Sequence, residues 1–262
     1  MTSSIVMGGS RWVRRTVVAL ALTAVVVGGW SGVGRAETEV TVASDVISAY
    51  VWRGITFNDE LVMQPSINVA HDSGFGLNIW TNLDIGDFGG RLDGGTFSEL
   101  DLTLSWALPI ELVDVTVGNI FYKFPQADDV DTGEFFVSAG KSVVEGVSVT
   151  GAIYYDYAQV DGTYGTLGVS VDPGALGLKL HEKLGLSASA NIGFASENFA
   201  VAYAGTDSGA FNWNIGGTAT WQLCEPVSVK AFVTYTDNVD RDVLPEQTVD
   251  VFGGGGLTWV WG

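Results

Sequence analysis

Alternation of apolar with small or polar residues is the feature that most constrains the fold of this chain. Residues 211–223 show it most clearly, because Phe211 and Trp213 alternate there with Asn212 and Asn214. Successive side chains of a β-strand point to opposite faces, so this period of two predicts a strand with one apolar and one polar face. Segments of this kind, each of about ten residues, follow one another from residue 39 to the C-terminus. The chain is therefore predicted to be all-β.

The connections between these segments predict how the strands close. The short connections are residues 71–74, 109–114, 144–146 and 224–226. The longer ones, which are mostly acidic, are residues 86–95, 125–134, 195–209 and 237–247. Short turns at one end and long loops at the other, with an even number of strands, are typical of outer-membrane barrels. We predict one antiparallel up-and-down transmembrane β-barrel of twelve strands over residues 37–262, with ten and fourteen strands as the alternatives.

Two stretches do not follow this rule of connections. The first predicted strand covers residues 39–57, and the connection after it, near residues 58–60, is too short for the loop end. Residues 172–183 are a long connection where a short one is expected.

The last segment, residues 248–261, ends on Gly256-x-x-Trp259-x-Trp261. With a period of two, Trp259 and Trp261 lie on the apolar face and Gly256 lies on the other. A chain that ends on such a strand resembles the closing strand of bacterial outer-membrane barrels, which the barrel assembly machinery reads as its signal. Aromatic rings also suit the level of the lipid headgroups. From this stretch alone, the alternative is the edge strand of a soluble β-sandwich.

Residues 1–36 have the pattern of a secretory signal peptide. Three arginines precede an apolar run at residues 17–27, and Gly34 and Ala36 are the small residues that a signal peptidase requires. A membrane anchor is the alternative, but the apolar run is short for a membrane span. We therefore predict cleavage after Ala36 and export to the bacterial outer membrane.

The exported chain is strongly acidic. Of the 12 basic residues, four arginines belong to the predicted leader, so eight remain against 30 acidic residues and the net charge is −22. This balance excludes a general nucleic-acid binder, which needs a basic face. Cys224 is the only cysteine, so neither an internal disulfide nor a metal cluster is expected. His71 and His181 have no nucleophile at motif spacing, and we predict neither an enzyme nor a cofactor.

Charged residues on the polar faces of the strands are the candidate functional residues, because a charge that faces lipid is costly. Arg53 has two interpretations: a constriction that selects solutes, or a structural ion pair with Asp45 or an acid of a neighbouring strand. A surplus of inward carboxylates favours cations, unless these groups are paired and plug the lumen. The predicted lumen-lining residues are Asp45, Arg53, Asp84, Glu99, Asp101, Asp156, Lys230 and Asp250.

The stretch Ser44-Asp45, followed by Tyr50-Val51-Trp52-Arg53-Gly54-Ile55, resembles an uncharacterised family of proteobacterial outer-membrane barrels. That family carries Ser-Asp-Tyr-Val-Trp-Arg-Gly-Ile near its mature N-terminus, followed by a strand that ends in a Ser-Gly-Phe-like turn. Here the turn is Ser73-Gly74-Phe75, and residues 46–49 separate Asp45 from Tyr50. The resemblance implies the barrel fold and the outer-membrane location, and no activity.

The predicted function follows from the size of the barrel. About eight strands enclose only side chains, whereas about sixteen to eighteen leave an open channel. We predict a narrow porin-like channel for small hydrophilic solutes with a weak cation preference. The alternative is a closed barrel with a structural or surface-interaction role. Small polar side chains that point inward would indicate the channel. Inward charge pairs, together with inward aromatic residues, would indicate a closed barrel, and Trp80, Tyr154 and Phe252 are such aromatic residues. The expected partners are outer-membrane lipid, the assembly machinery and the solutes, and the oligomeric state stays open.

Overall fold

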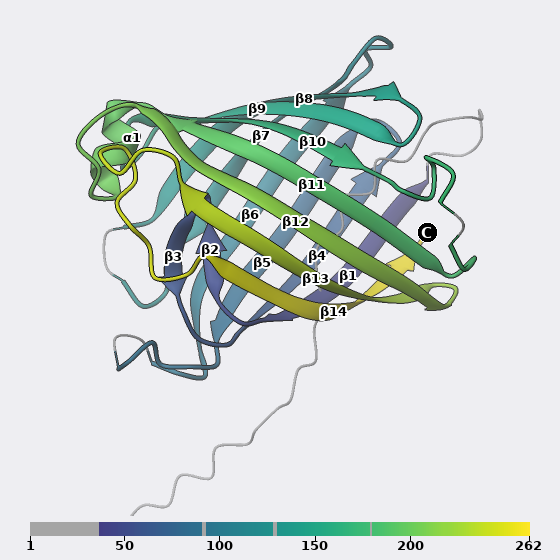
Figure 1. The fold of residues 1–262 in the computed structure, drawn as a ribbon, viewed down its shortest axis with the longest axis horizontal. Helices are drawn as coiled ribbons and strands as arrows, with labels where there is room; N and C mark the ends of the chain where they lie inside the picture. Colours follow the sequence, from purple (N-terminus) through teal and green to yellow (C-terminus); the bar gives the residue numbers. More distant parts are fainter. Residues whose placement is uncertain (1–36, 91–92, 128–129, 179) are drawn as a thin grey trace, which may run out of the picture.

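A closed antiparallel barrel of twelve strands forms the body of the protein (Figure 1). The computed structural model describes residues 37–90, 93–127, 130–178 and 180–262, so the predicted leader lies outside the described residues. Around the ring the strands follow one another in chain order, and β1 closes the ring by pairing with both β14 and β4. The predicted all-β fold and the count of twelve strands are confirmed.

The strands of the barrel are β1 (Thr38–Ile47), β4 (Val62–His71), β5 (Phe75–Asp84), β6 (Thr96–Leu108), β7 (Asp114–Lys123), β8 (Thr132–Val144), β9 (Val147–Asp156), β10 (Gly162–Val171), β11 (Leu184–Ala195), β12 (Gly209–Cys224), β13 (Val227–Asn238) and β14 (Val251–Trp261). A separate two-stranded sheet pairs β2 (Tyr50–Trp52) with β3 (Ile55–Asn58). One short helix, α1 (Glu197–Ala202), follows β11. No helix within the described residues is long and apolar enough to cross a membrane.

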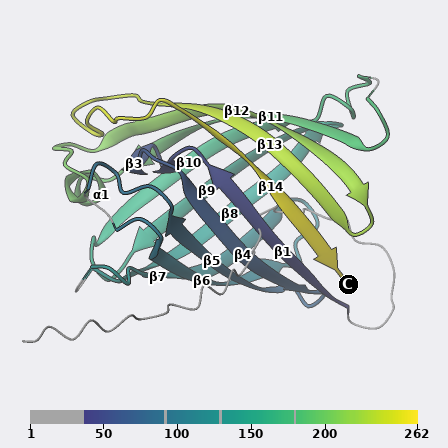
Figure 2. The same ribbon diagram turned by 90° about the horizontal axis from the view of Figure 1, so that it is seen from below.

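The two ends of the barrel differ in the length of their connections. We call the end that carries residues 72–74, 145–146 and 225–226 the short-turn end, and the opposite end the loop end. The C-terminal end of β14 lies at the short-turn end, whereas α1 and β3 lie at the loop end (Figures 1 and 2). Residues 172–183 are the long exception at the short-turn end, where the sequence places them.

Each barrel strand turns apolar side chains outward and small or polar side chains inward. On β6, for example, Leu102 and Leu104 are exposed on the outside whereas Glu99 is buried inside. Outward aromatic residues gather near both ends of the barrel, and we call these two groups the aromatic belts. The belt near the short-turn end contains Phe75, Trp106, Trp221, Trp259 and Trp261. The belt near the loop end contains Phe97, Phe121, Phe135, Tyr155 and Trp213.

The first predicted strand, residues 39–57, is wrong in its second half. β1 ends at Ile47, and residues 50–58 then fold back into the barrel as the β2–β3 pair, which we call the inner hairpin. Its two-residue turn consists of Arg53 with φ 51° and Gly54 with φ 82°. Two positive φ values are the geometry of a type I′ turn, whose twist matches that of the two strands it joins.

A β-bulge near the loop end corrects the predicted orientation of Phe211. The pairing of β11 with β12 shifts between Ile192, which faces Trp213, and Phe194, which faces Ala210. The extra residue in β12 bends the strand and turns its side chains. Phe211, predicted to face outward, is therefore fully buried inside.

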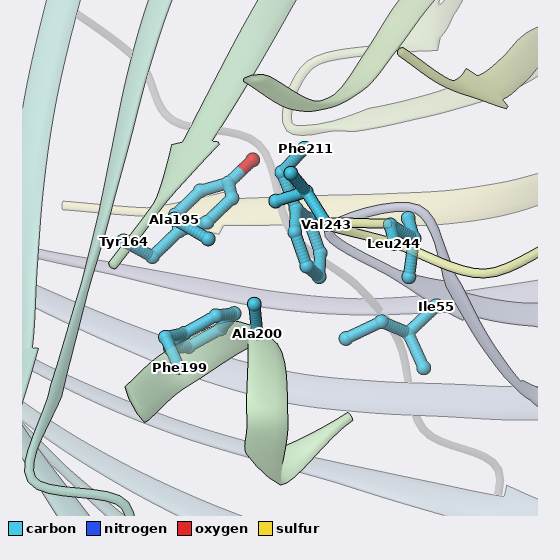
Figure 3. Packing of buried hydrophobic residues seen from close by; sticks show 8 residues of the cluster. All are labelled: Ile55, Tyr164, Ala195, Phe199, Ala200, Phe211, Val243 and Leu244. Carbon is cyan, nitrogen blue, oxygen red and sulfur yellow. The ribbon is translucent and has the colours of Figure 1, made fainter. Parts of the chain in front are cut away.

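Buried apolar residues from distant parts of the chain meet at the loop end, and we call them the apolar cap (Figure 3). The cap joins the inner hairpin to α1, to the loop before β14 and to the ends of β10, β11 and β12. Its members are Ile55, Tyr164, Ala195, Phe199, Ala200, Phe211, Val243 and Leu244. These packed side chains occupy part of the barrel interior at the loop end, so less free space remains there than the ring of twelve strands would enclose.

Replacing both Trp259 and Trp261 by Asp should block assembly of the barrel. β14 closes the ring between β13 and β1, and both indoles are exposed on its outer face. A charge that faces lipid costs up to about 2–4 kcal/mol, and less for Asp or near the interface, so loss of the predicted assembly signal is the larger effect. The measurement is the fraction of protein that migrates faster unboiled than boiled on a denaturing gel.

The control variant replaces both tryptophans by Phe, which keeps an aromatic outer face and should assemble like the wild type. A normal amount of folded Asp variant would mean that this face of β14 plays no part in assembly.

Candidate functional site

A buried ion pair attaches the tip of the inner hairpin to the barrel wall. Arg53 donates from Nη1 to Oε1 of Glu134 on β8 at 2.7 Å and from Nη2 to Oε2 at 2.6 Å. The two side chains are only 9% and 2% exposed. Two parallel hydrogen bonds fix the orientation of a guanidinium against a carboxylate as well as binding it. The pair therefore determines where the turn of the hairpin lies.

Aromatic rings surround the same guanidinium. Its central carbon lies 4.2 Å from the ring centre of Trp52, 4.3 Å from that of Tyr154 and 4.5 Å from that of Tyr164. A cation over the face of an aromatic ring is attracted to it. Burial disfavours the charge of Arg53, but the Glu134 carboxylate more than offsets this effect and holds the pKa of Arg53 above its ordinary value. Arg53 therefore stays charged inside the barrel.

Two further hydrogen bonds hold the strands of the inner hairpin. The Tyr50 hydroxyl donates to Oε2 of Glu99 on β6 at 2.8 Å. Asn58 Nδ2 donates to Oδ1 of Asp84 on β5 at 2.7 Å. Together with the ion pair of Arg53, these contacts tie β2, β3 and their turn to three different strands of the wall.

The structure brings three of the predicted lumen-lining residues, Arg53, Asp84 and Glu99, to the inner hairpin, and Asp101 lies beside Glu99 on the inner face of β6. Arg53 pairs with Glu134 and not with Asp45. Asp45 forms its own ion pair with Lys230 of β13 at 3.0 Å, on the inside of the barrel.

The last two predicted residues lie at the loop end. Asp156 is buried and accepts hydrogen bonds from the Thr132 hydroxyl and from the backbone N–H groups of residues 158–160, so it orders the turn after β9. Asp250 is exposed immediately before β14 and lines a cavity at the loop end. Asp156 therefore stabilises the wall, and Asp250 lies at the edge of the barrel interior.

Glu134 is a buried inward residue that is not among the predicted lumen-lining residues, because the sequence pattern places it in the connection at residues 125–134. The structure begins β8 at Thr132, which makes Glu134 an inward position of the strand. A signal was present in the alternation of Glu134, Phe136 and Ser138 with outward Phe135 and Val137.

Two polar cavities flank the tip of the inner hairpin. The lumen cavity has a volume of about 190 Å³, and its wall includes Ser189, Asn191, Asn214, Thr234 and Phe252. The loop cavity has a volume of about 90 Å³, and its wall includes Thr236, Asp237, Arg241, Glu246 and Asp250. Gly54, at the tip of the hairpin, lines both of them.

Between the hairpin and the short-turn end, the inner surface is uncharged and polar over most of the wall. Its side chains include Asn68, Asn78, Thr103, Ser138, Thr150, Thr166, Ser187 and Thr218. Groups of this kind bind water and hydrophilic solutes by hydrogen bonds. Within the described ranges, no group of three or more His, Cys, Asp or Glu residues is arranged to hold a metal ion.

Residues 33–252 match the family described as "Bacterial protein of unknown function (Gcw_chp)". No curated protein matches the sequence. Among solved structures, the KdgM porin has a TM-score of 0.54 at 8% identity, over 86% of this chain and 99% of that chain. The NanC porin has a TM-score of 0.50 at 8% identity, over 83% and 98% of the two chains. The KdgM porin in complex with disordered oligogalacturonate has a TM-score of 0.54 at 6% identity, over 86% and 100%. The chain thus has the fold of these porins.

Removing one partner of the Arg53–Glu134 pair should release the inner hairpin from the wall. Glu134→Gln leaves a buried guanidinium without its counter-charge, which typically costs about 3–5 kcal/mol. We expect residues 48–61 to become accessible to protease while the barrel stays folded. Limited proteolysis of the purified protein, with mass spectrometry of the fragments, measures this directly.

Two comparisons make the test specific to the buried pair. Arg53→Met combined with Glu134→Leu removes both charges and should restore part of the protection. Lys123→Met breaks the pair of Lys123 with Asp131, which contributes little because water screens both exposed side chains, and should change nothing. Equal protease resistance of Glu134→Gln and the wild type would contradict the anchoring role of the pair.

Proposed function

This chain belongs to the family described as "Bacterial protein of unknown function (Gcw_chp)", and we propose that it forms a narrow channel for small hydrophilic solutes in the bacterial outer membrane. The observation that carries the proposal is the small, uncharged and polar lining that runs from the short-turn end to the lumen cavity beside the hairpin tip. A lining of this kind is expected where water and solutes are in contact with the wall.

The outer surface supports the location in the membrane. Its exposed apolar side chains form a band between the two aromatic belts, and such belts lie at the two interfaces of a bilayer in outer-membrane barrels. Residues 1–36 have the pattern of the leader that export to this membrane requires. Both features favour a protein that is exported and then inserted as strands.

The charges inside the barrel favour cations weakly. The inward side chains described above include six carboxylates, those of Asp45, Asp84, Glu99, Asp101, Glu134 and Asp156. Among the inward side chains that the structure describes, two cations, Arg53 and Lys230, accompany them there. Acidic groups near a passage attract cations at close range. The preference is expected to be weak, because hydrogen bonds and ion pairs already engage most of these carboxylates.

The solved complex of a similar porin does not identify the solute of this chain. The KdgM porin is described in complex with oligogalacturonate, whose sugar units carry carboxylates. In this chain such a solute would meet the surplus of acidic groups beside the hairpin. We therefore propose passage of small hydrophilic solutes and not of acidic oligosaccharides.

A closed barrel with a structural or surface-interaction role is the second candidate. The observation that favours it is the filled loop end, where the inner hairpin and the apolar cap occupy much of the cross-section. In that case the acidic loops, and not the lumen, would make the functional contacts.

The location is tested by fractionation of cells that produce the protein. We expect it in the outer-membrane fraction, without residues 1–36, because the leader is removed during export. Recovery as a soluble periplasmic protein would rule out the proposed channel.

The electrostatic part is tested by reversal potentials across a salt gradient in planar bilayers. Lys230→Met should raise the cation preference, because it removes one of the two inward cations without touching the hairpin anchor at Arg53. The effect should be clearest in dilute electrolyte, since the screening length falls to about 10 Å at 0.1 M salt.

Lys123→Met is the matched control, because Lys123 is exposed outside the lumen and should leave the reversal potential unchanged. An anion-selective wild type would contradict the proposed electrostatics, and absence of conductance in every variant would favour the closed barrel.

A further inference from the structure

The two polar cavities lie on the same side of the inner hairpin and are separated by a single layer of residues. On β13, Thr234 lines the lumen cavity and Thr236, the next inward residue, lines the loop cavity. A step of the same size leads from Phe252 of β14, in the lumen cavity, to Asp250 just before that strand, in the loop cavity. Positions two apart on a strand are separated by about 6.6 Å. The barrier between the cavities is therefore one side chain thick.

Three residues form this barrier. Thr236 is only 1% exposed, and Asn212 on the neighbouring strand β12 is fully buried. Gly54 contacts Asn212 so closely that a Cβ atom at Gly54 would lie 2.6 Å from the Cβ atom of Asn212. The backbone of the hairpin tip thus rests directly on the β12 side of the wall.

The other sides of the hairpin are anchored more firmly. Arg53 is bound to Glu134 of β8, and Tyr50 and Asn58 are bound to β6 and β5. The apolar cap fills the space between the hairpin, α1 and β10. On the β12 side, by contrast, Gly54 contacts Asn212 and lines both cavities.

Unpartnered polar groups mark the same place. Asn212 Nδ2 and Thr236 Oγ1 are buried and form no hydrogen bond within the part of the chain that the structure describes. A buried polar group without a hydrogen-bond partner is unfavourable. These two groups are positioned to bind a water molecule or a hydroxyl or carbonyl group of a solute at the barrier.

We infer that solutes pass the inner hairpin between its tip and the β12–β13 wall, and that Gly54, Asn212 and Thr236 form the constriction that determines which solutes pass. This inference rests on the proposed channel function and adds the route and the selecting residues. The polar groups at the constriction are uncharged and able to form hydrogen bonds with a solute, so the constriction discriminates by size and by hydrogen-bonding capacity. The charge preference then arises from the carboxylates around it.

The test uses single cysteines in a Cys224→Ser background and a small, positively charged methanethiosulfonate reagent. Asn214→Cys places a thiol in the lumen cavity, directly opposite Thr236 in the strand register. Ser189→Cys is a second variant on the same cavity, in case Asn214→Cys does not fold. Lys123→Cys is the control, because Lys123 is exposed outside the lumen and lines neither cavity.

Modification of Asn214→Cys or Ser189→Cys should abolish most of the conductance in planar bilayers, whereas modification of Lys123→Cys should leave it nearly unchanged. Thr236→Gly should increase the conductance, because it removes a side chain from the barrier. Mass spectrometry establishes that each thiol has reacted.

Conductance that persists after complete modification at the lumen cavity, or that is lost equally after modification of Lys123→Cys, would overturn this route while leaving the channel function intact. A wild-type protein that does not conduct would overturn the channel function itself and the route with it.

Discussion

The buried pair of Arg53 and Glu134 is the interaction on which the interior of this barrel depends. Arg53 occupies a region of positive φ that is uncommon for a residue other than glycine. Such a conformation costs about 1–3 kcal/mol and persists only where the surroundings impose it. The bidentate contact with Glu134 and the three rings around the guanidinium supply that constraint. The turn, and with it the whole inner hairpin, is thereby fixed against the wall.

The hairpin divides the interior into two chemically different parts. Toward the loop end, the carboxylates of Glu99, Asp84 and Glu134 serve as acceptors for residues of the hairpin. Toward the short-turn end, the wall is mostly uncharged and polar, and it is continuous with the lumen cavity. A ring of twelve strands without the hairpin would enclose a wider space than the lumen cavity. The hairpin therefore occupies part of the barrel interior and leaves the lumen cavity along one side.

Much of the barrel could be predicted from the sequence, because the period of two reports directly which face of a strand is apolar. Glu99 and Asp101 are inward on β6 for that reason. The inner hairpin could not be predicted in this way, since residues 45–53 continue the same alternation as β1. The ion pair that holds it joins Arg53 to Glu134, 81 positions later in the sequence. A pattern of neighbouring residues cannot predict a contact between positions so far apart. The inward turn of Phe211 depends on a bulge, which shifts the register by one residue.

Single-channel recording of the wild type beside Glu134→Gln tests most directly whether the hairpin narrows a conducting barrel. The account predicts small, uniform steps for the wild type and larger, more variable steps for Glu134→Gln, because release of the hairpin widens the passage. Identical steps from the two proteins would contradict the role of the hairpin, and silence from both would contradict the channel.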